Sequence, residues 1–123
     1  MSGLKRSILI VDDDEEVRET LHDALAFEGF TVTVAHNGQE ALEALRADER
    51  APWLVLLDLM MPVMDGRTFL KVRGADADLA RIPVIVLSAG GDCREIKATQ
   101  DVAFCLPKTV RLPELMKAIA ASS

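Results

Sequence analysis

The clearest indication of the fold is the stretch Trp53-Leu54-Val55-Leu56-Leu57-Asp58, in which an apolar run ends abruptly in a single carboxylate. The run is too short to cross a membrane, and it has the length of a strand buried on both faces of a parallel sheet. Pro62 and Asp65-Gly66 follow and indicate a loop. Asp58 is therefore predicted at the carboxyl end of a central strand, where ligands bind in open α/β sheets. A lone aspartate there can equally cap the next turn, so the rest of the chain must decide.

Strands and helices are predicted to alternate along the whole chain. Apolar runs typical of strands cover residues 7–11, 30–35, 53–57, 82–87 and 102–106. Helices are predicted between Asp14 and Gly29, from the Asn37-Gly38 turn to about residue 48, over 67–73, weakly over 92–100, and from Pro113 onward. Five strand–helix pairs in strict alternation indicate an α/β protein with helices on both faces of a parallel sheet. Right-handed crossovers favour a doubly wound, flavodoxin-like sheet of five strands in the order 2-1-3-4-5, with five helices.

Length and charge narrow the classes of function. A chain of 123 residues has room for one domain, 1–123, and no output domain is expected within it. The net charge of −6 argues against DNA, RNA or an anionic membrane as a direct partner and favours a cation or a basic protein surface. Neither a signal peptide nor a transmembrane span is recognisable, so a cytoplasmic protein is expected.

The two cysteines carry no recognisable pattern of their own. Cys93 and Cys105 lack zinc spacing and a companion histidine cluster. In a cytosolic protein we expect them to be two reduced thiols.

Polar residues follow four of the predicted strands. They are Asp12 and Asp13 after the first strand, Asp58 after the third, Ser88 after the fourth and Lys108 after the fifth. Each alone has an ordinary explanation, such as a solvated helix start, a cap or a surface lysine. In the predicted strand order, however, all of them meet at one edge of the sheet.

This set of groups favours metal-assisted phosphoryl transfer. Three crowded carboxylates cannot all stay ionised without a counter-charge, and a hard divalent cation such as Mg²⁺ supplies it. Asp13, Asp58 and a backbone carbonyl just past Asp58 would form part of its shell. Lys108 adds a second positive group, and an aspartate can act as the nucleophile. Ser88 could then donate a hydrogen bond to a phosphoryl oxygen.

Four motifs resemble the receiver domain of two-component response regulators, the CheY-like family. They are Val11–Asp14, Asp58–Gly66, Ile82–Ala89 and Leu106–Lys108, in the family's order and over nearly the whole chain. The resemblance implies that Asp58 is the phosphoacceptor, and that Lys108 pairs with the acidic site and then with the phosphoryl group. It also implies that Ser88 couples phosphorylation to conformation. The implied Mg²⁺ ligands are Asp13 as the main one, Asp12, Asp58 and the backbone carbonyl of Met60.

The resemblance also implies partners. The phosphoryl donor would be a sensor histidine kinase or a phosphotransfer protein. The output would be altered binding of an unknown downstream protein through the face formed by the fourth helix, fifth strand and fifth helix. Whether two copies of the chain form a homodimer is left open. The protein is not expected to be an enzyme beyond weak self-phosphorylation and self-dephosphorylation.

Two positions depart from the family pattern. Cys105 stands where receivers usually carry an aromatic switch residue, and Phe104 should point to the opposite face of the sheet. Either other parts of the output face carry the signal, or the switch is muted or rewired. Thr109 follows Lys108 where the family often has a cis proline, so we expect a trans bond with a rearranged loop or a strained cis bond.

Three other functions compete with this interpretation. The main alternative is an atypical receiver that serves as a phosphorylation-independent protein-interaction module. A haloacid-dehalogenase-like phosphatase would need a second aspartate where Met60 stands. A flavin-binding module would need a phosphate loop after the first strand, where three acids would repel a phosphate.

Overall fold

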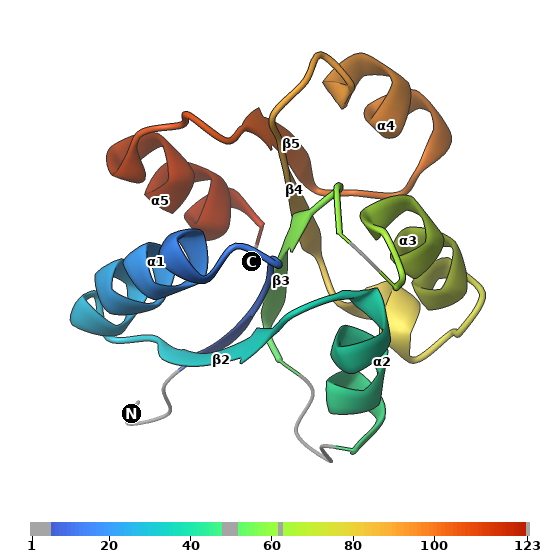
Figure 1. Ribbon diagram of the computed structural model, residues 1–123, viewed down its shortest axis with the longest axis horizontal. Coiled ribbons are helices and arrows are strands. Elements are labelled where there is room, and N and C mark those ends of the chain that lie inside the picture. The colour runs from blue at the N-terminus through green and yellow to red at the C-terminus, as the bar shows by residue number, and fades with distance from the viewer. Residues whose placement is uncertain (1–5, 48–51, 62, 123) are drawn as a thin grey trace.

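Five parallel strands run through the centre of the molecule in the order β2-β1-β3-β4-β5, which confirms the predicted order (Figure 1). The computed structural model describes residues 6–47, 52–61 and 63–122. The strands are β1 (Ser7–Val11), β2 (Thr31–Ala35), β3 (Leu54–Asp58), β4 (Val84–Ser88) and β5 (Phe104–Pro107). The helices are α1 (Glu15–Phe27), α2 (Gly38–Ala47), α3 (Gly66–Gly74), α4 (Cys93–Thr99) and α5 (Leu112–Ala121), and a short 3₁₀ helix, η1, spans Leu79–Arg81.

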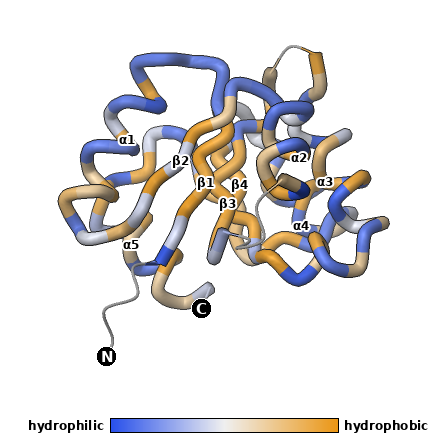
Figure 2. The backbone as a smooth tube through the Cα atoms, turned by 90° about the horizontal axis from the view of Figure 1, so that it is seen from below, coloured by the Kyte–Doolittle hydropathy of each residue, from blue (hydrophilic) through white to orange (hydrophobic). Residues whose placement is uncertain are grey.

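The sheet separates two apolar cores, and the strands form the hydrophobic centre of the molecule (Figure 2). Leu54 and Leu56 of β3 pack with α1 and α5 on one face. Val55 and Leu57 pack with α2, α3 and α4 on the other. This alternation follows from the two-residue period of a strand. Burying each such side chain contributes about 1.5–3 kcal/mol relative to leaving it exposed, so β3, buried throughout, anchors both layers.

Strand register brings the polar strand ends to one edge. Val11 of β1 lies beside Leu57 of β3, and Asp58 lies beside Leu87 of β4. Ser88 at the end of β4 lies beside Pro107 of β5. The residues that follow these strands therefore share the carboxyl edge of the sheet, as predicted.

The helix boundaries follow local signals. The Asp14 side chain accepts hydrogen bonds from the backbone N–H groups of Glu16 and Val17, which caps α1. Gly29 has a φ of 99°, a left-handed conformation that favours glycine directly after a helix. Both positions agree with the predicted ends of this helix.

Three local predictions needed adjustment. β4 begins at Val84 rather than at residue 82, because Pro83 has no N–H and the Ile82 carbonyl accepts hydrogen bonds from the Arg73 guanidinium. β5 is shorter than predicted, and η1 forms in a segment predicted to be irregular.

Among the described residues no peptide bond is cis, so the bond after Lys108 is trans. No helix in residues 6–47, 52–61 and 63–122 combines the length and hydropathy needed to cross a membrane.

Candidate functional site

Three carboxylates meet at the carboxyl edge of the sheet. Asp12 and Asp13 follow β1 directly, and Asp58 is the last residue of β3. One oxygen from each lies within 4.8 Å of those of the other two. Asp12 and Asp58 are 2% and 3% exposed, whereas Asp13 is exposed to solvent. The backbone N–H of Asp12 donates to the Ala35 carbonyl at 3.1 Å, which fixes the chain as it leaves β1.

Lys108 supplies the positive charge beside these acids. Its Nζ atom lies 3.2 Å from Oδ2 of Asp12 and 3.2 Å from Oδ2 of Asp58. The backbone N–H of Lys108 donates to the Ser88 carbonyl at 2.9 Å, which continues the pairing of β4 and β5 past Pro107. Strand pairing therefore positions the ammonium group between the two buried carboxylates.

Burial and charge shift the pKa values of the site. Loss of solvent, and then the negative charge of Asp12, raise the pKa of Asp58, and the Met60 N–H and Lys108 only partly oppose this. Burial lowers the pKa of Lys108, but attraction by Asp12 and Asp58 outweighs it, so that its pKa is raised. Lys108 is thus held as a cation, and one lysine does not balance three carboxylates.

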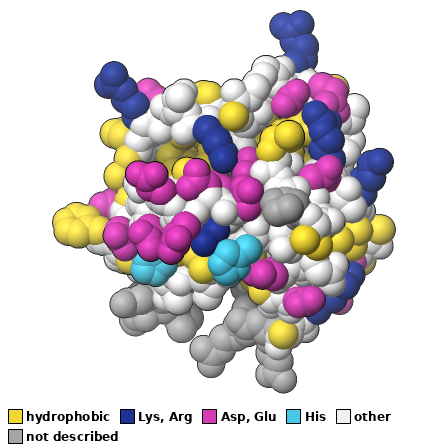
Figure 3. Space-filling model, in the orientation of Figure 1, with side chains coloured by type: hydrophobic (Ala, Val, Ile, Leu, Met, Phe, Trp, Pro, Cys, Tyr) yellow, Lys and Arg dark blue, Asp and Glu magenta, His cyan; other side chains and the backbone are white. Residues whose placement is uncertain are grey.

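The donor set suits a hard divalent cation. Oδ2 of Asp58 is buried and accepts no hydrogen bond of regular geometry within the described ranges, although it forms the ion pair with Lys108. Asp12 and Asp13 add further carboxylate oxygens within 4.8 Å. Oxygen ligands with excess negative charge are what Mg²⁺ prefers, so the residues present fit this ion. Acidic side chains also gather over α1 on the face shown in Figure 3.

A tight loop places Met60 beside Asp58. The Met60 N–H donates to Oδ1 of Asp58 at 3.3 Å, and its side chain is exposed. Gly66 lets the loop close, because a Cβ there would lie 2.7 Å from the Leu59 Cα atom. Val63 has a φ of 69°, a strained conformation for a β-branched residue. Pro62, which helped to predict the loop, lies outside the described residues.

Ser88 reaches this edge but bonds to the loop between β4 and α4. Its Oγ atom donates to the Gly90 carbonyl at 3.1 Å and accepts from the Gly90 N–H at 3.2 Å. It also lies 3.5 Å from Oδ2 of Asp92, and Ser88 is 2% exposed. The hydroxyl is therefore held by the loop rather than by the carboxylates.

The cysteines correct a prediction, because Cys93 and Cys105 form a disulfide rather than two reduced thiols. Their Cα atoms are 5.3 Å apart, within the usual range for such a bond. The predicted strand order could have suggested this pairing. The helix between two neighbouring parallel strands starts at the edge of the sheet where the second strand ends, so this order places Cys93 and Cys105 on the same side of the molecule. Cys105 packs with the core under α2, α3 and α4, and Phe104 with the core under α1 and α5, which confirms their opposite orientations.

Replacing Asp58 with Asn should stabilise the metal-free protein at neutral pH. The raised pKa of Asp58 means that the folded state binds this proton more tightly than the unfolded state does. The native protein therefore loses stability as pH rises from the ordinary value of 3.8 through the raised pKa, and stays destabilised above it. We expect D58N to raise the free energy of unfolding by about 1–2 kcal/mol at pH 7. The gain should vanish near pH 3. Urea unfolding in EDTA at both pH values measures this.

Asp65→Asn is the matched control. Asp65 is exposed and caps α3, and its hydrogen bond from the Thr68 N–H lowers its pKa. Removing that charge should slightly destabilise the protein at neutral pH, the opposite sign to D58N. A loss of stability in D58N at pH 7 would contradict the description of the Asp58 environment.

Comparisons with known proteins give a consistent result. The family model of the response regulator receiver domain matches residues 8–120. Response regulator MprA of Mycobacterium ulcerans (strain Agy99) is 41% identical over 117 residues, covering 93% of this chain and 48% of that protein. The chain thus spans about half the length of the curated relatives it matches.

Solved structures agree with the sequence comparisons. A response regulator receiver protein from Pseudomonas putida has a TM-score of 0.87 and 26% identity, over 98% of this chain and 99% of that one. Response regulator TrrA from Thermotoga maritima, solved in complex with Mg(2+)-BeF, has a TM-score of 0.84 and 26% identity, over 96% and 99%. These similarities confirm the predicted flavodoxin-like, CheY-like fold.

Proposed function

Because the chain belongs to the receiver domains of two-component response regulators, we propose that Asp58 accepts a phosphoryl group from a phosphohistidine. The donor is a sensor histidine kinase or a phosphotransfer protein. One observation carries the proposal: Asp58 ends a fully buried strand with an oxygen that accepts no regular hydrogen bond among the described residues, next to the Lys108 ammonium. No observation favours the phosphorylation-independent interaction module.

The transfer uses groups already in place. A carboxylate oxygen of Asp58 attacks the phosphorus, the phosphorus–nitrogen bond breaks, and the imidazole leaves with the electron pair and takes up a proton. Negative charge spreads over the phosphoryl oxygens in the transition state. Lys108, 3.2 Å from the Asp58 carboxylate, stabilises that charge from a partly buried position.

A Mg²⁺ ion would be held by the carboxylates of Asp12, Asp13 and Asp58 and by the backbone carbonyl of Met60. When bound, it would neutralise charge on the phosphoryl oxygens. The Ser88 hydroxyl lies on the neighbouring strand and would donate to a phosphoryl oxygen after leaving the Gly90 carbonyl. That change moves the loop before α4, and so alters the α4-β5-α5 face that binds a downstream partner. We place the protein in the cytoplasm and assign it no turnover beyond weak self-phosphorylation and self-dephosphorylation.

Intact-mass spectrometry after incubation with Mg²⁺ and acetyl phosphate tests the proposed function. We expect the native chain to gain one phosphoryl group, only with Mg²⁺ present, and D58N to gain none. Asp65→Asn, which removes an exposed carboxylate on the same loop, should still be phosphorylated. Absence of any gain in the folded native protein, or a gain that persists in D58N, would overturn the assignment.

A further inference from the structure

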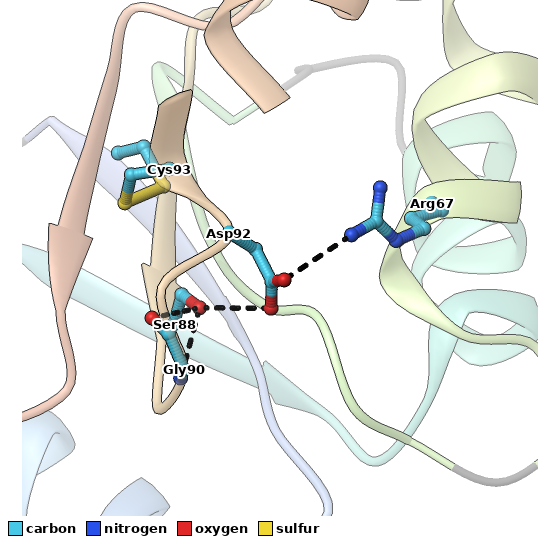
Figure 4. Close-up of a disulfide and its surroundings, with 6 residues drawn as sticks. Arg67, Ser88, Gly90, Asp92 and Cys93 are labelled. Carbon is cyan, nitrogen blue, oxygen red and sulfur yellow. Dashed lines mark hydrogen bonds and ion pairs between the residues drawn. A yellow bond between two sulfur atoms is a disulfide. The ribbon is translucent and has the colours of Figure 1, made fainter. Parts of the chain in front are cut away.

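The disulfide between Cys93 and Cys105, close to the loop that holds Ser88 (Figure 4), has no part in the chemistry above. Cys93 is the first residue of α4, and Cys105 lies in β5, an edge strand of the sheet. Both residues are partly exposed. A small reductant or oxidant from solution can therefore approach this pair, which a cystine buried in the core would not permit.

A short series of contacts joins the disulfide to the Ser88 hydroxyl. Cys93 directly follows Asp92, whose Oδ2 lies 3.5 Å from Oγ of Ser88 and whose Oδ1 lies 3.7 Å from Arg67. Figure 4 shows Ser88, Gly90, Asp92 and Cys93 along one loop, with Arg67 reaching toward it from α3. The disulfide thus anchors one end of the loop, and the other end carries the hydroxyl.

The helix that the disulfide holds has few other anchors. α4 has seven residues, and Ile96 is its only fully buried side chain. Asp92, at its N-cap, makes no capping hydrogen bond through its side chain. Arg67 contacts Glu95 on its exposed side. A helix of this length has little stability of its own, so the covalent link to β5 decides how firmly it is held.

We propose that Cys93 and Cys105 form a reversible thiol–disulfide switch that sets how readily this receiver is phosphorylated. The disulfide form holds α4 and the loop before it, and keeps the Ser88 hydroxyl bonded to Gly90. The dithiol form releases the loop, so that Ser88 can turn toward the phosphoryl group. This inference deepens the proposed function and rests on it.

The chemistry of the switch is exchange with a dithiol reductant. A thiolate of the reductant attacks one sulfur and forms a mixed disulfide, and the released protein thiolate takes up a proton. The second thiol of the reductant then attacks the mixed disulfide and frees the other cysteine. Two electrons and two protons pass to the protein, and the reductant becomes a disulfide. A disulfide oxidant reverses each step.

The proposed location of the protein supports a switch over a permanent crosslink. Disulfides in the cytosol are usually transient and serve catalysis or redox sensing. The pairing here spans a sequence separation of 12 residues and closes a short loop at the functional edge. Because of this position, reduction of the disulfide should change the conformation of the Ser88 loop rather than that of the whole fold.

The test compares two redox forms of the native chain. One is equilibrated with oxidised glutathione and the other with dithiothreitol, and intact mass confirms the loss or gain of two hydrogens. We expect the reduced form to be phosphorylated by acetyl phosphate and Mg²⁺ about fivefold faster or more. The double variant Cys93→Ser/Cys105→Ser should match the reduced form and ignore both reagents. Hydrogen exchange on the unphosphorylated protein should be faster over residues 88–107 in the reduced form.

The outcomes separate the switch from the proposed function. Equal rates in two forms that both become phosphorylated, or failure to form the disulfide with oxidised glutathione, would overturn the switch. Absence of phosphorylation in both forms would overturn the proposed function instead. In that case hydrogen exchange still decides: unchanged protection over residues 88–107 would overturn the switch, and redox-dependent protection would support the coupling of the disulfide to the Ser88 loop.

Discussion

Replacing Lys108 with Met should slow phosphoryl transfer to Asp58 by about 100-fold, the cost typical of removing one charge-stabilising group from a transition state. The methionine keeps the aliphatic length of the side chain but removes the ammonium that lies 3.2 Å from both Asp12 and Asp58. Nothing else among the described cations pairs with these carboxylates. The initial rate of phosphoprotein formation with acetyl phosphate and Mg²⁺, followed by intact mass, measures the effect.

Two further variants serve as controls for the Lys108→Met prediction. Lys117→Met removes the same charge from an exposed position on α5 and should leave the rate unchanged. Lys108→Arg keeps the charge but presents a planar group, so we expect partial activity. A K108M rate within about twofold of the native one would show that the ammonium stabilises no charge in the transition state.

Replacing Arg73 with Met should lower the free energy of unfolding by about 3 kcal/mol. Arg73 on α3 is 3% exposed, and its guanidinium donates to three backbone carbonyls, those of Ile82, Ala80 and Asp101. Methionine fills the space but leaves the buried Ile82 carbonyl without its guanidinium donor, and it also removes the donors to the partly buried carbonyls of Ala80 and Asp101. Urea unfolding should show a lower midpoint with an unchanged slope, since the same surface is exposed.

Arg81→Met is the matched control for this prediction. Arg81 is also an arginine near the start of β4, but its side chain is 82% exposed and lies 3.8 Å from Asp78. Exposed ion pairs of this kind contribute about 0–1 kcal/mol. Equal losses in the two variants would mean that the hydrogen bonds of Arg73 are not what holds η1 and the segment before β5 in place.

Burial also affects the charged state of the Arg73 guanidinium. Loss of solvent lowers its pKa, and the nearby Asp101 charge only partly opposes this. Burying a guanidinium is tolerable because its donors are taken up by carbonyls that no strand uses. Nothing in the local pattern of α3 distinguishes Arg73 from an ordinary cation near a helix end. Only the folded chain shows that its hydrogen bonds link α3 to η1 and to the segment before β5.

The order of elements, the strand order and the meeting of Asp12, Asp13, Asp58 and Lys108 could all be predicted before the structure was known. The elements could be predicted because their patterns are local, and the strand order followed from right-handed crossovers in a doubly wound sheet. Apolar runs mark buried strands, and parallel strands necessarily share one carboxyl edge. Ser88 was correctly placed at that edge for the same reason. The functional roles of these residues remain predictions for the experiments above.

The partners that individual side chains take could be identified only in the folded chain. The bonds of Ser88 to Gly90 and Asp92, the burial of Arg73 and the pairing of Cys93 with Cys105 depend on distances between separate elements. The expectation of reduced thiols relied on the usual state of cytosolic cysteines and ignored that α4 and β5 bring these two sulfurs together. Sequence patterns report which face of an element is buried, whereas contacts between neighbouring elements follow from how the layers pack.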